Sequence, residues 1–306
     1  MNSIEVKNLS KKFGEFTSVN NISFNVKKGE VFGFLGPNGA GKSTTIRMLC
    51  GILKPTSGDA IVGGFSVMNQ PEKVKQKIGY MSQKFSLYND LTVEENINFF
   101  GNIYGLTNSV LEERKKWVLS VADLIGKEKL LTNSLPGGIK QRLALGTAVI
   151  HRPEIVFLDE PTSGVDPIAR RIFWELINSL SEDGTTVFVT THYLEEAEYC
   201  NNIILIDAGK LIAEGNSKEL KERYIQNKIL EIECERISEA IEILSKEYFV
   251  EESNIFGNSI HISVNNFYQS EEQIKNILSV NSINVLKVSE VNPTLEDVFI
   301  YLVDQK

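Results

Sequence analysis

Short apolar runs alternate with amphipathic segments between residues 31 and 190. Apolar runs at residues 31–35, 155–158 and 186–190 predict buried strands, because each is too short for a core helix and lies between turn signals. Strands that alternate with helices predict an α/β fold with a parallel or mixed sheet. The helices are expected at residues 43–49, 92–104, 110–124, 139–150 and 168–180.

Further strand patterns lie on both sides of this region. Residues 4–6 and 22–26 predict strands near the start of the chain, and residues 203–214 predict a hairpin around Ala208-Gly209. Ser57-Gly58 indicates a turn. With these elements the α/β region extends to about residue 220.

After a charged helical segment at residues 218–224, the pattern starts afresh. It predicts strand, helix, strand, strand, helix and strand over residues 228–288, and a last helix over residues 294–302. This βαββαβ order predicts a small α+β ferredoxin-like domain. We therefore expect two domains, residues 1–220 and residues 221–306.

Glycine content and charge change at the same boundary. The chain has 22 glycines and a net charge of −8, but only Gly257 lies after residue 220, and residues 221–306 alone carry a charge of −7. Glycine collects where the backbone turns sharply or approaches a ligand closely. We expect the chemistry before residue 220. The acidic domain after it is expected to contact protein and not an anionic membrane surface.

Composition excludes several other classes of protein. No apolar run approaches the length of a membrane span, and the start of the chain lacks the pattern of a secretory signal. Cys50, Cys200 and Cys234 are widely spaced, which argues against a disulfide framework or a zinc site. The sequence has no basic patch, which argues against nucleic acid binding. We expect a cytoplasmic protein.

Residues 36–44 form the first chemical motif. They match the phosphate-binding pattern G-x4-G-K-[ST] and lie between an apolar strand and a helix. The glycines let backbone amides converge on phosphate oxygens, Lys42 reaches the β and γ phosphates, and Ser43 offers its hydroxyl to Mg²⁺. The motif predicts binding of a nucleoside triphosphate. The expected contacts are Gly36, Pro37, Asn38, Gly39, Ala40, Gly41, Lys42, Ser43 and Thr44.

Two carboxylates end the apolar strand at residues 155–158. Asp159 is placed to meet Mg²⁺, directly or through water. Glu160 beside it can polarise the water that attacks the γ phosphate. A strand that ends in Asp-Glu is usually a solvated boundary, but the phosphate-binding motif in the same chain favours the catalytic interpretation.

Six motifs in a fixed order identify a family. The other four are Gln83, Leu135-Pro136-Gly137-Gly138, Ser163-Gly164-Val165-Asp166-Pro167 and His192. In this order, residues 3–220 resemble the nucleotide-binding subunit of an ATP-binding cassette (ABC) transporter. The resemblance implies a P-loop NTPase core with a mixed sheet, an N-terminal antiparallel β subdomain and a helical insert at about residues 84–150. It also implies ATP and Mg²⁺ as ligands.

The resemblance assigns roles to single residues. Gln83 would link Mg²⁺ and the attacking water to the transporter interface, and His192 would contact the γ phosphate and orient that water. Phe13 matches the aromatic residue that stacks on adenine, and Phe16 is the weaker candidate. Asp166, in the D-loop, is assigned to the nucleotide site.

The signature motif departs from the family pattern. Pro136 stands where the family has serine, in a segment that closes over the nucleotide of a second subunit. Pro136 offers neither a hydroxyl nor a backbone N–H, whereas Gly137 and Gly138 still present amides at a helix start. The resemblance implies that the family's serine hydroxyl donates to the γ phosphate held by the other subunit. Losing that charge-assisted hydrogen bond would weaken dimer closure by about 1.5 to 3 kcal/mol, which would slow hydrolysis without abolishing ATP binding. We expect an active ATPase, with a regulatory cassette of little turnover as the alternative.

Two further segments narrow the branch of the family. Residues 164–174 and 293–300 resemble ABC-2-type export ATPases, which include drug, antibiotic and lipid exporters. This implies a separate ABC-2-type permease, a second copy of this chain or a paralogous ATPase, and attachment to the inner face of the cell membrane through the permease. Phe85-Ser86-Leu87-Tyr88 and Phe99-Phe100 are candidate permease contacts. The remaining alternative is an ABC ATPase of ribosomes or chromosomes, which predicts duplicated cassettes, long coiled coils or basic patches.

Overall fold

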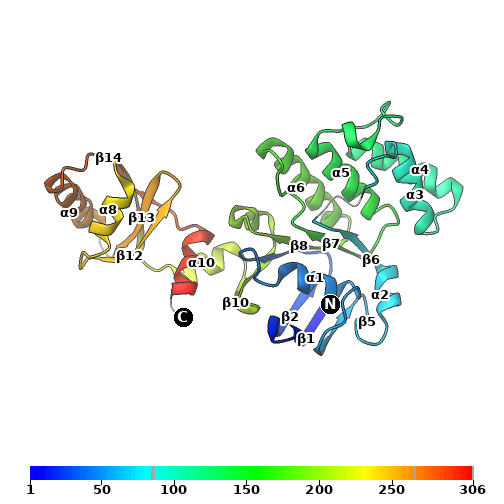
Figure 1. The fold of residues 1–306 in the computed structure, drawn as a ribbon, viewed down its shortest axis with the longest axis horizontal. Coiled ribbons are helices and arrows are strands. Elements are labelled where there is room, and N and C mark those ends of the chain that lie inside the picture. The colour runs from blue at the N-terminus through cyan, green and yellow to red at the C-terminus, as the bar shows by residue number, and fades with distance from the viewer. Residues whose placement is uncertain (84–86, 265–266, 305–306) are drawn as a thin grey trace. The chain divides into compact units, whose positions relative to one another are not determined.

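The computed structural model describes residues 1–83, 87–264 and 267–304. The chain forms two compact units, Met1–Asn216 and Ser217–Lys306, whose elements are labelled in Figure 1. Among the described residues, no helix combines the length and the apolar character that a membrane span requires.

A six-stranded mixed sheet forms the centre of the first unit, as predicted. Its order is β10-β9-β3-β8-β7-β6, and all neighbours are parallel except β10, which pairs antiparallel with β9. Every residue of β3, β7 and β8 is buried, which explains why apolar residues occupy the middle of all three strands. Because parallel strands end at one edge, the segments after β3, β7 and β8 come together. The strands are β3 Val31–Leu35, β6 Ile78–Met81, β7 Ile155–Asp159, β8 Thr186–Thr191, β9 Asn202–Asp207 and β10 Lys210–Gly215.

A second, antiparallel sheet forms the N-terminal β subdomain. Its order is β2-β1-β4-β5. The turn predicted at Ser57-Gly58 is wrong, because both residues begin β4. A Cβ atom at Gly58 would lie 2.1 Å from the carbonyl oxygen of Asn8, so glycine here permits close strand pairing. The strands are β1 Asn2–Phe13, β2 Phe16–Lys27, β4 Ser57–Val62 and β5 Phe65–Ser66.

Helices cover the central sheet. α3, α4 and α5 group together as the helical insert, and α6 lies beside α5 (Figure 1). The predicted start of α3 is confirmed: Thr92 and Glu95 form a reciprocal capping box. The helices are α1 Lys42–Leu49, α2 Pro71–Lys77, α3 Val93–Ile103, α4 Asn108–Val121, α5 Gly137–Ala148 and α6 Pro167–Glu182.

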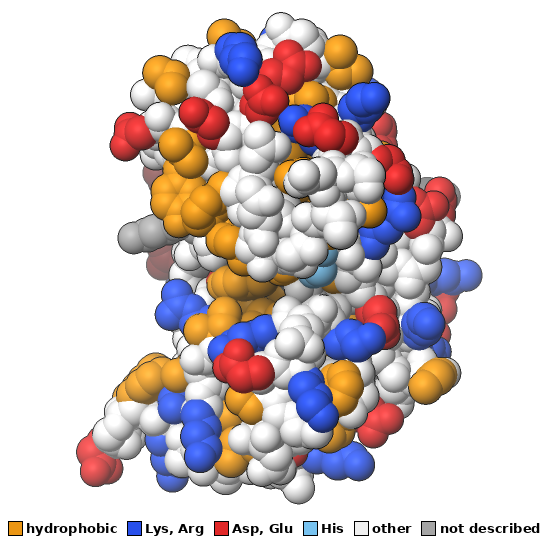
Figure 2. Space-filling model, turned by 90° about the vertical axis from the view of Figure 1, so that its right-hand side faces the viewer, with side chains coloured by type: hydrophobic (Ala, Val, Ile, Leu, Met, Phe, Trp, Pro, Cys, Tyr) orange, Lys and Arg blue, Asp and Glu red, His pale blue; other side chains and the backbone are white. Residues whose placement is uncertain are grey.

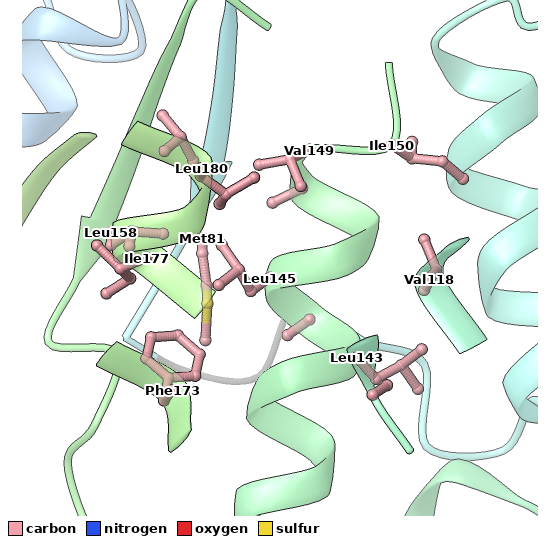
Figure 3. Packing of buried hydrophobic residues seen from close by; sticks show 14 of the residues in the cluster. Met81, Val118, Leu143, Leu145, Val149, Ile150, Leu158, Phe173, Ile177 and Leu180 are labelled. Carbon is pink, nitrogen blue, oxygen red and sulfur yellow. The ribbon is translucent and has the colours of Figure 1, made fainter. Parts of the chain in front are cut away.

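Two hydrophobic clusters hold the first unit together. One joins the helical insert and α6 to the sheet through side chains such as Met81, Leu145 and Phe173 (Figure 3). The other fills the space between the two sheets, where the rings of Phe32 and Phe188 stack with centroids 5.6 Å apart. These clusters fix the edge of the sheet where β3, β7 and β8 end.

The second unit has the predicted ferredoxin-like topology. Its antiparallel sheet has the order β12-β13-β11-β14. α8 and α9 contribute Leu244, Ile274 and Leu278 to a core with the apolar side chains of β11 and β13. The elements are α7 Ser217–Tyr224, β11 Lys228–Cys234, α8 Ile237–Leu244, β12 Val250–Phe256, β13 Ser259–Val264, α9 Phe267–Val280, β14 Val285–Val291 and α10 Leu295–Asp304.

A buried histidine–aspartate pair connects α10 to this sheet. Nδ1 of His261 on β13 lies 3.0 Å from Oδ1 of Asp297 on α10, and both side chains are buried. Thr294 also donates to Asp297 from its backbone N–H and its hydroxyl. Burial raises the pKa of Asp297, but the hydrogen bonds from His261 and Thr294 outweigh it, so the pKa lies below its ordinary value. The pair therefore stabilises the ionised carboxylate.

Candidate nucleotide-binding site

The loop between β3 and α1 has the backbone of a phosphate cradle. Gly39 and Gly41 have φ angles of 83° and 107°, in the left-handed region that favours glycine. A Cβ atom at Gly41 would lie 2.5 Å from the carbonyl oxygen of Ser18, and one at Gly36 would lie 2.1 Å from that of Ile206. The glycines of the motif are therefore required by the path of the chain itself.

The other predicted contacts in this loop differ in exposure. Pro37, Asn38 and Gly39 form its exposed tip. Ala40 is buried, and the hydroxyl of Thr44 accepts a hydrogen bond from Ser18. The tip is open to a ligand, whereas its two ends are fixed to the β subdomain and the central sheet.

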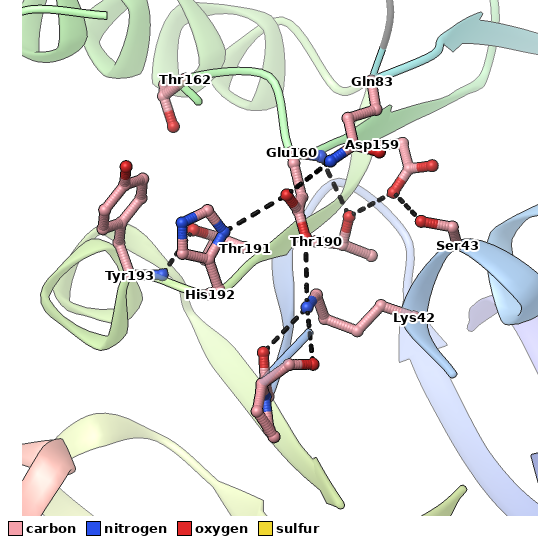
Figure 4. Close-up of polar contacts among 12 residues, drawn as sticks. Lys42, Ser43, Gln83, Asp159, Glu160, Thr162, Thr190, Thr191, His192 and Tyr193 are labelled. Carbon is pink, nitrogen blue, oxygen red and sulfur yellow. Dashed lines mark hydrogen bonds and ion pairs between the residues drawn. The ribbon is translucent and has the colours of Figure 1, made fainter. Parts of the chain in front are cut away.

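Lys42 is a buried cation at the base of the loop (Figure 4). Its Nζ donates to the carbonyl oxygens of Gly36 and Pro37 at 2.8 and 3.1 Å. It also lies 3.1 Å from Oε1 of Glu160, and only 4% of the Lys42 side chain is exposed. A buried ammonium requires an anionic partner. In this structure Glu160 is that partner.

Ser43 and Asp159 meet at the start of α1. The hydroxyl of Ser43 donates to Oδ1 of Asp159 at 3.0 Å, and Thr190 donates to the same oxygen at 2.8 Å. Burial raises the pKa of Asp159, while these two hydrogen bonds act in the opposite direction without cancelling the effect. A cation at Asp159 would therefore stabilise the ionised carboxylate.

Glu160 lies at the centre of the predicted catalytic residues. Its φ angle is +47°, which is uncommon for a residue with a side chain, and its backbone N–H donates to Thr190. Nε2 of Gln83 donates to Oε2 of Glu160 at 2.9 Å. Nδ1 of His192 lies 3.2 Å from the same oxygen, without hydrogen-bond geometry. The structure therefore brings Lys42, Gln83 and His192 to one carboxylate (Figure 4).

The oxygen atoms at this edge fit Mg²⁺. Magnesium prefers oxygen ligands and usually binds one or two carboxylates together with phosphate oxygens and water. Ser43 and Asp159 supply a hydroxyl and a carboxylate that already contact each other. Among the described residues, no group of three or more His, Cys, Asp or Glu side chains could hold a metal ion. Ser43 and Asp159 therefore fit a metal that keeps several water or phosphate ligands.

The signature segment lies at the start of α5. Pro136 is the N-cap residue and makes no side-chain cap hydrogen bond. Gly137 is exposed, with no atom within 4 Å of a Cβ placed on it. Gly138 differs, because its Cβ would lie 2.5 Å from that of Ala169 on α6. Glycine at 138 is therefore required for helix packing, whatever else its amide does.

Asp166 and Phe13 lie apart from the residues around Glu160. The carboxylate of Asp166 accepts from the backbone N–H groups of Ile168 and Ala169, so it caps α6. Phe13 ends β1, half exposed, and Nζ of Lys11 lies 5.2 Å from its ring centroid. Phe16 faces Phe13 across the hairpin and is more exposed. The nucleotide roles of Asp166 and Phe13 stay predictions.

The sequence did not reveal Thr190. It donates to the carboxylate of Asp159 and accepts from the backbone N–H of Glu160, and so connects the two residues. The only available signal was a hydroxyl residue near the end of a strand that would lie next to residues 155–158. A second missed group, Thr162, Arg170 and Glu196, is described below.

The fold and these contacts define a P-loop nucleoside triphosphatase. Residues 19–163 match the family model described as "ABC transporter", and residues 215–303 match that of the "ATP-binding protein DrrA1-3-like, C-terminal domain". The chain belongs to the ABC transporter family.

Curated relatives cover the chain to different extents. It is 37% identical over 304 residues to the linearmycin resistance ATP-binding protein LnrL of Bacillus subtilis, covering 98% of this chain and 97% of that protein. It is 53% identical over 218 residues to the probable multidrug ABC transporter ATP-binding protein YbhF of Escherichia coli. That match covers 71% of this chain but only 38% of YbhF. The chain thus matches well under half the length of YbhF.

Solved structures are similar over the first unit. A dimeric ATP-binding cassette in a post-hydrolysis state, bound to ADP and Pi, is 29% identical with a TM-score of 0.64, covering 70% of this chain and 98% of that one. The ATP-binding subunit of an ABC transporter is 28% identical with a TM-score of 0.66, covering 72% and 92%. These similarities confirm the predicted ABC-type fold of the core.

Proposed function

We propose that this chain binds ATP with Mg²⁺ and hydrolyses it to power a separate ABC-2-type permease that exports its substrate. The observation that carries the proposal is the convergence of Lys42, Gln83 and His192 on Glu160, beside the glycine loop. A salt bridge between Lys42 and Glu160 with a structural role alone would not need Gln83, His192 or the glycine loop beside it. Hydrolysis of a nucleoside triphosphate uses all of them.

Each residue of the site has its own role in ATP binding or hydrolysis. Lys42 turns from Glu160 to the β and γ phosphates, which replace the carboxylate as its anionic partner. Ser43 and Asp159 hold Mg²⁺, which when bound neutralises charge on the phosphates. Glu160, released from Lys42, accepts a proton from the attacking water. Gln83 and His192 orient that water from two sides of the carboxylate.

A second subunit would complete the site. α5 begins with the exposed Gly137, followed by the partly buried Gly138. Because Pro136 has no hydroxyl and no N–H, the polar groups of this segment are the backbone amides of Gly137 and Gly138. Helix N-termini bind anions through free N–H groups and the helix dipole. We propose a head-to-tail dimer of two copies, or of this chain with a paralogue, in which α5 of one subunit faces the nucleotide of the other.

The permease contact is proposed for an aromatic cluster of the helical insert. Tyr88 and Phe99 pack edge to face with centroids 4.8 Å apart, and Phe99 contacts Phe100 in the same way. Tyr88 is 50% exposed and Phe99 is 37% exposed. Figure 2 shows hydrophobic side chains gathered in patches on the face that lies on the side of α3 and α4. Phe85 and Ser86, predicted to join this contact, lie outside the described residues.

The names of the relatives support export. LnrL confers linearmycin resistance by its name, and a relative from Cupriavidus metallidurans, 38% identical over 230 residues, is named a Nod factor export ATP-binding protein. The DrrA-like match of the second unit supports the same branch. We place the chain at the inner face of the cell membrane, attached through its permease.

A Glu160→Gln variant tests the proposal. The amide keeps the size of the side chain but cannot accept a proton from water, so turnover should fall by roughly 100-fold or more while ATP binding persists. The variant should therefore accumulate an ATP-bound dimer. Phosphate release and molar mass with ATP and Mg²⁺ measure the two effects.

Glu175→Gln is the matched control, because Glu175 is an exposed residue of α6 that forms an ion pair with Arg171. It should hydrolyse ATP like the wild type. A wild type without ATPase activity, even with its permease present, would overturn the hydrolytic proposal and favour a regulatory cassette.

A further inference from the structure

A carboxylate outside the nucleotide site is buried with few partners. Glu196 lies on the 3₁₀-helix η2, Leu194–Tyr199, and only 1% of the residue is exposed. Its Oε1 accepts a hydrogen bond of 2.5 Å from the hydroxyl of Thr162. Its Oε2 has no hydrogen-bond partner within the described residues. Burying a carboxylate with one hydrogen bond costs free energy, so a buried glutamate of this kind indicates a structural or functional role.

Arg170 supplies the charge that faces Glu196. Its Nε lies 3.5 Å from Oε1 of Glu196, and its Nη1 lies 2.7 Å from Oε1 of the exposed Glu195. The guanidinium also stacks on the ring of Tyr193, with 4.3 Å between Cζ and the ring centroid. Arg170 therefore contacts η2 and the residue that follows His192.

These contacts form a closed chain of residues that includes His192 and Glu160. The ring of Tyr193 lies 4.1 Å from that of His192, and His192 reaches Glu160. Glu160 is two residues before Thr162, which returns to Glu196 through the 2.5 Å hydrogen bond. Figure 4 shows Thr162, Tyr193 and His192 on one side of Glu160. The loop after β7 and the segment after β8 are thus connected through side chains.

We infer that Glu196 is a positioning residue, which with Thr162 and Arg170 sets the place of His192 relative to Glu160. The inference rests on the proposed hydrolysis, because His192 and Glu160 act on the same water. The buried carboxylate of Glu196 contacts Thr162 and Arg170 through directional polar interactions, which fix the two segments relative to each other. Apolar side chains at these positions would lack that directionality. Thr162 also belongs to the loop that leads to Asp166, the N-cap residue of α6.

Kinetics of four variants test the inference. Glu196→Ala and Thr162→Val remove the two ends of the hydrogen bond, and each should lower kcat by roughly ten-fold to 100-fold with the ATP KM unchanged, since misplacement affects the reacting geometry and not nucleotide contacts. Thr162→Ser keeps the hydroxyl and should restore most of the rate. Glu195→Gln is the control, because Glu195 contacts the same arginine from the surface, and it should behave like the wild type.

A ligand-free measurement separates this inference from the proposed function. The chain has three histidines, His151, His192 and His261, so imidazole resonances of the isotope-labelled protein can be assigned by substitution. Glu196→Ala should shift the His192 ring signals and leave those of His261 in place. Unchanged His192 signals would overturn the inference even if the wild type proves inactive. So would an unaltered kcat in an active enzyme, or equal losses in kcat and ATP affinity.

Discussion

Asp159 and Glu160 are neighbours in the sequence but have separate partners in the structure. Asp159 accepts from Ser43 and Thr190, whereas Glu160 faces Lys42, Gln83 and His192. The left-handed backbone of Glu160 turns the chain between them. This strained conformation at a residue with a side chain is typical of functional sites. It gives the two carboxylates at one strand end different partners, as the proposed metal ligand and base require.

Phe13 offers a test at the scale of one side chain. Stacking of a base on an aromatic ring contributes about 1 to 3 kcal/mol, so Phe13→Ala should raise the ATP Kd by roughly five-fold to 100-fold. The half-exposed ring leaves room for a base. Titration calorimetry with Mg-ATP measures the constant.

Phe16→Ala is the matched control, because Phe16 lies opposite Phe13 in the same hairpin and is also exposed. Its ATP Kd should stay at the wild-type value. A larger effect at Phe16 than at Phe13 would transfer the adenine contact to Phe16, and no effect at either would remove it from this hairpin.

Residues in local motifs could be predicted, whereas residues defined by contacts between distant segments could not. Lys42 and Ser43 follow from one eight-residue pattern, and its glycines indicate the backbone conformation that the loop requires. Thr190 acts on Asp159 across neighbouring strands, 31 positions away. Glu196 resembles a surface glutamate in the sequence, because its burial depends on η2 folding over Thr162. Neither position has a local signal.

At the scale of elements, the packing of α5 on α6 controls where the signature segment lies. Gly138→Ala would place a Cβ 2.5 Å from that of Ala169, so one of the helices must shift. Overpacking of this kind costs about 1 to 3 kcal/mol, which exceeds the gain of up to about 1 kcal/mol in helix propensity. The urea midpoint of the first unit should therefore fall.

Gly137→Ala is the control from the same helix turn. A Cβ there meets nothing within 4 Å, so its unfolding midpoint should equal or exceed that of the wild type. Equal stability of the two variants would contradict the packing explanation for Gly138. If Gly137→Ala keeps its stability but the ATP-bound dimer weakens, the result would favour the proposed trans contact.

Element prediction succeeded where burial is complete and failed where backbone pairing decides. β3, β7 and β8 are buried throughout because both faces of the sheet are covered. β4 begins with Ser57-Gly58, a turn signal that the chain uses for close approach to β1 instead. A glycine requires space or backbone freedom, and the sequence does not say which.

At the scale of the whole molecule, chemistry and charge are divided between the units. The contacts around Lys42, Asp159 and Glu160 all lie within Met1–Asn216, together with two of the three hydrophobic clusters. Residues 217–306 have their own core and carry most of the excess negative charge of the chain. This division follows the change in glycine content along the sequence.

Removal of residues 217–306 should therefore leave ATP binding intact and weaken assembly. The contacts described around Lys42, Asp159 and Glu160 are made by residues 1–216, so the ATP Kd of the shortened chain should equal that of the full chain. Its acidic surface is unsuited to anionic lipid but can contact protein, so the ATP-bound dimer of the shortened Glu160→Gln variant should dissociate more readily. Light scattering over a dilution series, with full-length Glu160→Gln as the control, measures this. Equal dimer affinities would show that the second unit has no part in pairing, and a raised ATP Kd would show that the nucleotide site depends on it.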